Sequence, residues 1–247
     1  MAQTMTQQIG IGVIGCGGRI GGLLAGILDG DPRVRITALY DTEPEQIVRY
    51  RNRFKTSAPA FDSAEALVVA PDVDWVLIGS WNCFHAAQAI AALRAGKHVF
   101  CEKPLATSVQ DCLDVRNAWR DSGRSFTMGF TLRYSPHYRE VQRILAAGEI
   151  GRIVSMEFNE TLEFNHGGFI MANWRNQTKN AGSHILEKCC HDIDLANWMT
   201  GSVARRVASF GGSNFFTPEN AGQIQRVKQR EGQNPFGWGG LNLFGQN

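Results

Sequence analysis

Short apolar segments alternate with helical patterns along the first 130 residues of the chain. The segment 73–78 shows no regular polar alternation, which is typical of a parallel strand that is covered on both faces, and two further strands are predicted at 11–14 and 34–40. Between them, apolar residues at helical spacing predict a helix over 20–28. By the same criteria the sequence predicts helices at 43–53, 82–95 and 109–120 and extended segments at 73–78, 98–101 and 125–130. This order predicts a doubly wound parallel α/β sheet.

The pattern changes after about residue 130. Helical spacing predicts helices at 136–147 and 185–199. Strict alternation at 153–164 predicts a strand with one buried face, as in an open antiparallel sheet, and a further strand is predicted at 203–210.

We therefore expect two domains, residues 1–125 and residues 126–247. The stretch 213–247 is rich in Gly, Asn and Gln at its end, keeps neither helix nor strand period, and is predicted to be irregular. A sheet of two strands is marginally stable alone, so the second domain looks truncated.

The composition narrows the class of protein. The chain has 247 residues, of which 43% are hydrophobic and 19% charged, with a net charge of +2. This balance argues against a disordered chain and gives no reason to expect nucleic acid or a membrane as partner. The first eight residues lack the basic cluster and apolar core of a signal peptide, so we expect a cytoplasmic protein.

The six cysteines do not predict a metal site. None is in a Cys-x-x-Cys spacing, and free thiols are expected in a reducing compartment. Cys189 and Cys190 precede His191, but neighbouring cysteines rarely bind one ion well and no second cluster accompanies them. We expect no metal.

A glycine turn between the first strand and the first helix predicts a dinucleotide site. Such a turn tolerates positive φ, lets a pyrophosphate approach the backbone, and presents the N–H groups of a helix N-terminus. Asp41 ends the second strand, at the position where a carboxylate binds the adenosine ribose in such sites. Its charge would repel the 2′-phosphate of NADP and therefore favours NAD. Arg49 and Arg53 lie nearby in sequence and leave NADP as the alternative. The predicted turn residues are Gly15, Gly17, Gly18, Arg19 and Ile20. A glycine turn without a ligand, or the turn of a methyltransferase, would also fit this motif alone.

The segment Glu102-Lys103-Pro104 follows the predicted strand at 98–101. Carboxyl ends of parallel strands meet at the ligand crevice, so Glu102 and Lys103 are expected at the cofactor. A lysine there can donate a proton or stabilise charge on a substrate oxygen. Taken alone, the segment would equally fit a surface Glu-Lys pair before a helix that starts at Pro104.

Six motifs occur in one order along the chain. They are Gly15 to Gly18, Asn82-x-x-His85, the segment Ala95 to Ala106 with Glu-Lys-Pro, Gly129-Phe-x-x-Arg133-Tyr134, Gly148-x-Ile-Gly151, and His191-x-x-Asp194. Over residues 9–212 the sequence closely resembles the glucose-fructose oxidoreductase, inositol dehydrogenase and MocA family of NAD(P)-dependent oxidoreductases. The resemblance implies an N-terminal Rossmann domain, a C-terminal α/β domain with an open antiparallel sheet, and hydride transfer between nicotinamide and a sugar-like alcohol or ketone.

The resemblance also implies roles for individual residues. Lys103 corresponds to the lysine of the family's Glu-Lys-Pro motif and His191 to the histidine of its catalytic helix, and Glu187 stands where the family commonly has Asp. Helical spacing independently places Glu187, His191 and Asp194 on one face, where a carboxylate can orient an imidazole. A surface histidine paired with Glu187 is the structural alternative.

Further residues are candidates with a structural alternative beside each. Asn82 and His85 are expected near the nicotinamide ribose, although Asn82 could equally be a helix N-cap. Substrate contacts are expected from polar and aromatic side chains of the second half, although Trp174 and Arg175 could instead be a surface Arg stacked on Trp, and Arg133 a brace between the domains. These candidates are Arg133, Trp174, Arg175 and Asp194.

Three functions follow as hypotheses. The first is an NAD-dependent oxidoreductase for a sugar or polyol, with Lys103 and His191 as the proton-handling pair. The second uses the same cofactor transiently to cleave a glycoside, with no net NADH. The third is a non-catalytic, truncated NAD-binding chain. Exposed sheet edges would promote association, so a homo-oligomer is expected.

Overall fold

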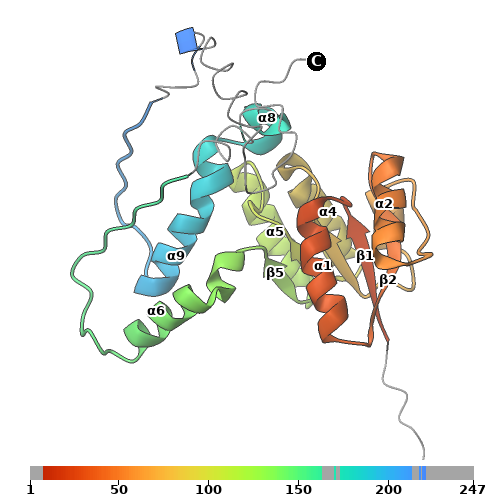
Figure 1. Cartoon of the computed structure of the whole chain (residues 1–247), viewed down its shortest axis with the longest axis horizontal. Coiled ribbons are helices and arrows are strands. Elements are labelled where there is room, and N and C mark those ends of the chain that lie inside the picture. Colours follow the sequence, from red (N-terminus) through yellow and green to blue (C-terminus); the bar gives the residue numbers. More distant parts are fainter. Residues whose placement is uncertain (1–7, 163–169, 171–172, 213–216, 218, 221–247) are drawn as a thin grey trace, which may run out of the picture. The chain divides into compact units, whose positions relative to one another are not determined.

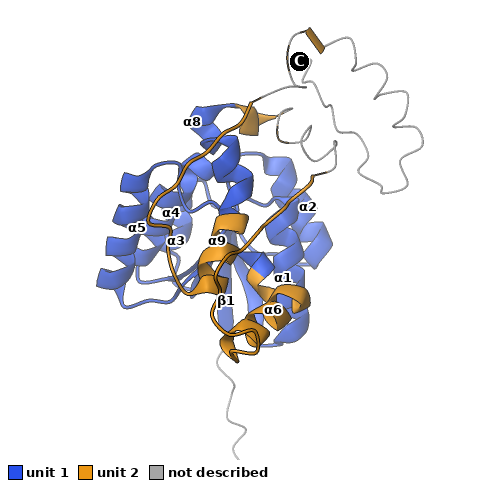
Figure 2. Ribbon diagram, turned by 90° about the vertical axis from the view of Figure 1, so that its left-hand side faces the viewer, with its two compact units in different colours: residues 1–132, 177–190 blue, residues 133–176, 191–247 orange. Residues whose placement is uncertain are grey.

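The structure is a computed structural model that describes residues 8–162, 170, 173–212, 217 and 219–220. The chain divides into two compact units, shown in different colours in Figure 2. The first unit comprises Met1–Leu132 and Gln177–Cys190, and the second comprises Arg133–Asn176 and His191–Asn247. The short segment Gln177–Cys190 thus belongs to the first unit although it follows a long excursion of the chain.

A five-stranded sheet in the order β2-β1-β3-β4-β5 forms the centre of the first unit (Figure 1). All four strand pairs are parallel. The strands are β1 (Ile9–Ile14), β2 (Val34–Tyr40), β3 (Trp75–Ile78), β4 (His98–Cys101) and β5 (Phe126–Met128). The predicted doubly wound parallel sheet is confirmed.

Helices cover both faces of this sheet, which explains why successive residues of its central strands are buried on either side. In β1, Val13 packs into the core under α1 and α2, whereas the next residue, Ile14, packs into the core under α3, α4 and α5. Both side chains are fully buried, and each such burial stabilises the fold by about 1.5–3 kcal/mol. The helices are α1 (Gly18–Gly30), α2 (Pro44–Phe54), α3 (Ala64–Val68), α4 (Asn82–Arg94) and α5 (Val109–Ser122).

The short helix α3 is absent from the sequence prediction. It begins after Ser63, whose hydroxyl oxygen accepts a hydrogen bond from the backbone N–H of Ala66 at 3.1 Å. This N-cap is the signal that could have revealed the helix.

The sheet reverses its winding direction between β1 and β3. At such a switch point the loops after the two strands separate and leave a crevice at their carboxyl ends. Gly15, after β1, has a φ of +83°, and a Cβ atom there would lie 2.6 Å from the backbone of Gly79, after β3. Gly15 and Gly79 therefore pack backbone against backbone directly after β1 and β3.

The second unit is helical within the described residues. The 3₁₀ turn η1 at Thr131–Tyr134 begins in the first unit and ends in the second, because the boundary falls after Leu132. A second 3₁₀ turn, η2, lies at Trp174–Asn176. The longer helices of the second unit are α6 (Pro136–Ala146) and α9 (Cys190–Thr200). Two shorter elements, α8 (Thr178–Ala181) and the π-helical turn η3 (Ile185–Cys189), precede α9 and belong to the first unit.

The two strands predicted for the second unit are wrong for the described residues. Residues 153–162 and 203–210 form no strand, and positions 163–164 of the first prediction lie outside the described residues. Alternation tells which side chains a strand would bury, but a strand exists only where a neighbouring backbone completes its hydrogen bonds. Val154 and Val207 remain 86% and 82% exposed. Most of the stretch 213–247, predicted to be irregular, also lies outside the described residues.

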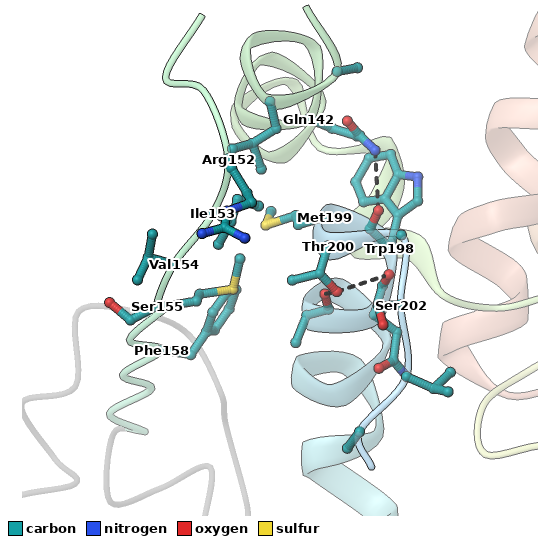
Figure 3. A pocket seen from close by; sticks show the side chains of 18 of the residues that line it. Gln142, Arg152, Ile153, Val154, Ser155, Phe158, Trp198, Met199, Thr200 and Ser202 are labelled. Atoms are coloured by element: carbon teal, nitrogen blue, oxygen red, sulfur yellow. Dashed lines mark hydrogen bonds between the residues drawn. The ribbon is translucent and has the colours of Figure 1, made fainter. Parts of the chain in front are cut away.

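A cavity of about 840 Å³ lies inside the second unit, between α6, the segment 151–158 and the end of α9 (Figure 3). Its lining is mostly apolar, with Ile153, Phe158 and Met199 among the side chains that surround it. The Gln142 amide donates a hydrogen bond to the Trp198 carbonyl at 3.2 Å across the top of this cavity. Val154, Met156 and Phe158, which alternation predicts on one face of a strand, therefore border this open cavity rather than a sheet.

Two further findings concern the described part of the chain alone. No helix in it is both long and apolar enough to cross a bilayer. No group of three or more His, Cys, Asp or Glu side chains is placed there to hold a metal ion.

A pair of glycine substitutions tests the packing at the switch point. In Gly79→Ala the new methyl group would collide with the Ile20 side chain, so we expect a loss of about 1–3 kcal/mol of unfolding free energy. Gly26→Ala, on the exposed side of α1 with open space around it, is expected to gain up to about 1 kcal/mol from helix propensity. Urea unfolding of both variants measures the difference; a neutral Gly79→Ala would contradict this packing.

Candidate functional site

The turn between β1 and α1 is open where a phosphate would approach. A Cβ atom built on Gly17 or Gly18 would meet no heavy atom within 4 Å. The first turn of α1 carries no acidic residue, and its N–H groups lack intrahelical partners. The Tyr50 hydroxyl donates to the Gly17 carbonyl at 2.9 Å, so α2 holds this turn from its far side. The turn has the geometry and the positive end of a helix dipole that an anion requires.

Asp41 lies beside this turn. Its Oδ2 atom accepts a hydrogen bond from the Cys16 backbone N–H at 2.7 Å, and its Oδ1 atom accepts one from Glu43 N–H at 2.9 Å. Each carboxylate oxygen still has capacity for one more donor. Burial, together with the Asp41 charge, raises the pKa of the Cys16 thiol to about 12, so this thiol is neutral beside the carboxylate.

Lys103, at the carboxyl end of β4, forms a partly buried ion pair with Glu187 of η3. The Lys103 Nζ atom lies 3.2 Å from Glu187 Oε1 and donates to the Glu187 backbone carbonyl at 2.7 Å. The side chains are 19% and 8% exposed, so both charges are largely removed from water.

Asn82 completes the surroundings of Glu187. Its amide nitrogen donates to Glu187 Oε2 at 2.6 Å and to the Ala181 carbonyl at 3.0 Å, which uses both N–H groups. The alternative of an N-cap is wrong: Asn82 is the first residue of α4, and Trp81 occupies the cap position without a side-chain hydrogen bond. The Asn82 amide thus makes a hydrogen bond to a charged carboxylate, which is stronger than the neutral hydrogen bond that an N-cap makes to a backbone N–H.

Glu102 and Arg19 join the glycine turn to the end of β4. Arg19 Nε donates to Glu102 Oε1 at 3.0 Å, and another guanidinium nitrogen donates to Thr131 Oγ1 at 2.7 Å. A Cβ atom on Gly129 would lie 2.8 Å from Glu102 Oε2, so that glycine makes room for the carboxylate. Thr131 was not predicted, and no sequence signal marks it.

His85 does not face a ligand with its ring. The residue is fully buried, and both ring nitrogens lie on backbone carbonyls, Nδ1 at 2.7 Å from Pro104 O and Nε2 at 3.0 Å from Ser80 O. The ring therefore has no polar atom left for the cofactor contact expected from the sequence.

In the second unit, two predicted substrate residues bind each other. Arg133 and Asp194 form a bidentate ion pair with distances of 2.7 and 2.6 Å, and the guanidinium lies 5.5 Å from the Trp198 ring centroid. The hydrogen bonds from the guanidinium to the Asp194 carboxylate raise the pKa of Arg133. His191 is the second residue of α9 and Asp194 lies three residues further on.

Trp174 and Arg175 are also stacked. The Arg175 guanidinium lies 4.1 Å from the Trp174 ring centroid, as the structural alternative predicts. Contact of either residue with substrate stays a prediction.

The doubly wound parallel sheet and the glycine turn after its first strand define a class: a chain with a Rossmann domain of the dinucleotide-binding kind. The family model described as "Oxidoreductase family, NAD-binding Rossmann fold" matches residues 9–130, and the GFO/IDH/MocA C-terminal domain model matches residues 138–227. The chain belongs to the GFO/IDH/MocA family of oxidoreductases, and the resemblance stated from its motifs is confirmed.

Relatives with named activities share part of their length with this chain. Inositol 2-dehydrogenase of Gluconacetobacter diazotrophicus is 33% identical over 78% of this chain and 55% of its own length. The 2,7-anhydro-N-acetylneuraminate hydratase of Escherichia coli is 29% identical over 83% of this chain and 53% of its own length. The chain thus spans about half the length of the curated relatives it matches.

A solved structure with bound ligands is also similar. Levoglucosan dehydrogenase, in complex with NADH and levoglucosan, superposes with a TM-score of 0.71 at 27% identity, covering 79% of this chain and 55% of that one. The expected NAD cofactor agrees with this likeness and with the family description.

A double-mutant cycle tests the Lys103–Glu187 pair. We expect Lys103→Ala, Glu187→Ala and the double variant to give a coupling of about 1–3 kcal/mol in unfolding free energy at pH 7, because each single change leaves a largely buried charge. The control cycle is the exposed pair Arg143 and Glu140, for which much weaker coupling is expected. Equal coupling in the two cycles would contradict the burial of the pair.

Proposed function

We propose that this chain uses NAD to move a hydride between nicotinamide and a hydroxyl-bearing carbon of a sugar or polyol derivative. One observation carries the proposal: the Lys103 ammonium lies at the carboxyl end of a central parallel strand, 3.2 Å from the Glu187 carboxylate. Ligands of doubly wound sheets bind at this edge. Relatives named inositol 2-dehydrogenase and levoglucosan dehydrogenase support a polyhydroxylated substrate.

The residues present fit the cofactor. The open turn at Gly17 and Gly18 would accept the pyrophosphate on backbone N–H groups, and the spare acceptor capacity of Asp41 would take the ribose hydroxyls. Arg19 and Ile20 would border this site from the start of α1. The bound nicotinamide supplies the hydride chemistry.

The chain's own residues handle the proton. Lys103 donates a hydrogen bond to the substrate oxygen and stabilises the negative charge that develops there. His191 removes the hydroxyl proton as general base and returns it in the reductive direction, since imidazole can do both near neutral pH. Glu187, four residues before His191, orients the imidazole. Arg133, Asp194, Trp174 and Arg175 are the proposed substrate-facing residues of the second unit.

A second candidate function has its own support. The Escherichia coli relative is named a hydratase rather than a dehydrogenase, although it matches 83% of this chain. A reaction that uses NAD transiently and ends without net NADH, such as glycoside cleavage, would use the same residues. Product release without NADH accumulation distinguishes it. A non-catalytic NAD-binding chain would show tight NAD binding and no turnover of any sugar. A homo-oligomer in the cytoplasm stays a prediction.

The substitutions Lys103→Ala and His191→Ala test the proton-handling pair. We expect each to lower kcat by about 10²–10⁴-fold on an inositol or sugar that the wild-type protein turns over, because each removes a group that acts on the reacting oxygen. Steady-state NADH absorbance, with product analysis beside it, measures the loss.

The matched controls are Lys97→Ala and His137→Ala, whose side chains lie elsewhere, and both are expected to keep wild-type turnover. Lys97 donates to the Ala70 carbonyl, and His137 is exposed on α6. Wild-type turnover in Lys103→Ala and His191→Ala together would refute the assignment.

Asp41→Asn tests the choice between NAD and NADP. The amide keeps an acceptor for the Cys16 N–H but loses the charge that would repel a 2′-phosphate. We expect at least a tenfold shift of the Kd ratio toward NADP, measured by calorimetry, and no shift in the control Asp29→Asn on the exposed end of α1. An unchanged ratio would remove Asp41 from the ribose site.

A further inference from the structure

His85 is a buried histidine that the mechanism above leaves without a task. It is fully buried in α4, and both ring nitrogens contact backbone carbonyls of other segments. Ser80 follows β3 after one glycine, and Pro104 follows Lys103. The ring thus connects the chain segments that leave two neighbouring strands at the carboxyl edge of the sheet.

With the His85 contact to Pro104, each of the three consecutive residues Glu102, Lys103 and Pro104 has a polar contact to another segment of the chain. The Glu102 carboxylate accepts from Arg19 at 3.0 Å, and the Lys103 ammonium pairs with Glu187 at 3.2 Å. Pro104 has no N–H, so its carbonyl is its sole backbone polar group, and the His85 ring lies 2.7 Å from it. Each of the three residues is held by a different part of the chain.

The two contacts of the ring differ in length, and we place the ring proton on Nδ1, which makes the shorter one. Burial lowers the pKa of His85, although the two carbonyls and the charges of Glu102 and Glu187 act in the opposite direction. A neutral ring has one N–H, so it can donate to one carbonyl. Placing the proton on Nδ1 makes the shorter 2.7 Å contact with the Pro104 carbonyl a hydrogen bond, and Nε2 then has no proton to donate to the Ser80 carbonyl 3.0 Å away.

We propose that His85 is a positioning residue: its Nδ1–H holds the Pro104 carbonyl and thereby sets the backbone from which the Lys103 ammonium reaches Glu187. It is not a cofactor ligand, because its ring has no exposed atom. The consequence for turnover rests on the proposed function, whereas the consequence for the position of Lys103 does not.

Three substitutions at His85 separate the two ring contacts. His85→Asn keeps an amide donor near the position of Nδ1, His85→Gln places one nearer to Nε2, and His85→Phe keeps the ring shape with no donor. The matched control is His98→Phe, a histidine at the start of β4 that stacks on Trp75 and accepts from the Ser125 N–H.

The first readout is the position of the ammonium itself. ¹H–¹⁵N spectra of the lysine Nζ groups, with Lys103 assigned through Lys103→Arg, report whether its ion pair persists. We expect the Lys103 signal to be lost to exchange or shifted in His85→Phe and His85→Gln, and to stay near its wild-type position in His85→Asn. The Lys97 signal, from a lysine bonded to the Ala70 carbonyl, is the internal control and should not move.

The second readout is the split between kcat and NAD binding. We expect kcat to fall at least tenfold in His85→Phe and His85→Gln, to recover most of its value in His85→Asn, and the Kd of NAD to change less than threefold. Equal effects of Asn and Gln, or an unmoved Lys103 signal in a folded His85→Phe, would overturn the proposal. So would a tenfold loss of NAD affinity with the Lys103 signal in place, because the ring would then act on the cofactor. If the Lys103 signal moves as expected but Lys103→Ala keeps full turnover, the positioning role stands and the proposed function fails.

Discussion

The largely buried ion pair of Lys103 and Glu187 is the interaction on which the candidate site depends. Its two side chains lie mostly out of water, and the attraction between their charges offsets the free-energy cost of removing each from water. Asn82 donates a hydrogen bond to the other carboxylate oxygen, and the Glu187 backbone carbonyl accepts a second hydrogen bond from the ammonium. An ammonium that is already oriented in this way meets the condition for stabilising a negative charge that develops beside it.

The parallel sheet places that pair where a dinucleotide would bind. The switch between β1 and β3 brings the turns at Gly15 and Gly79 together, and β4 ends beside them at Glu102. Arg19 bridges from the first helix to Glu102, so the phosphate-binding turn and the lysine segment share one charged contact. The glycine turn and Lys103 therefore lie at one edge of the sheet, within a single unit of the chain.

Much of this first unit could be predicted. Continuous apolar runs predicted covered parallel strands, and the glycine turn with Asp41 twenty-six positions after Gly15 predicted a dinucleotide site. The strands predicted at 153–164 and 203–210 were wrong within the described residues, because alternation specifies a face but not a partner backbone. For Asn82 the preference of Asn for N-caps was outweighed by a buried carboxylate 105 positions further along the chain.

The sequence by itself determined the parallel sheet, most of its covering helices and the candidate site residues, because these follow from local periodicity and from motifs of a few residues. The tertiary structure alone decided which partners those side chains have. It assigned the segment Gln177–Cys190 to the first unit, turned Arg133 and Asp194 toward each other, and placed His85 on Pro104. Such pairings join residues from distant parts of the chain, and their energies depend on burial and on the geometry of both partners, which no local pattern contains.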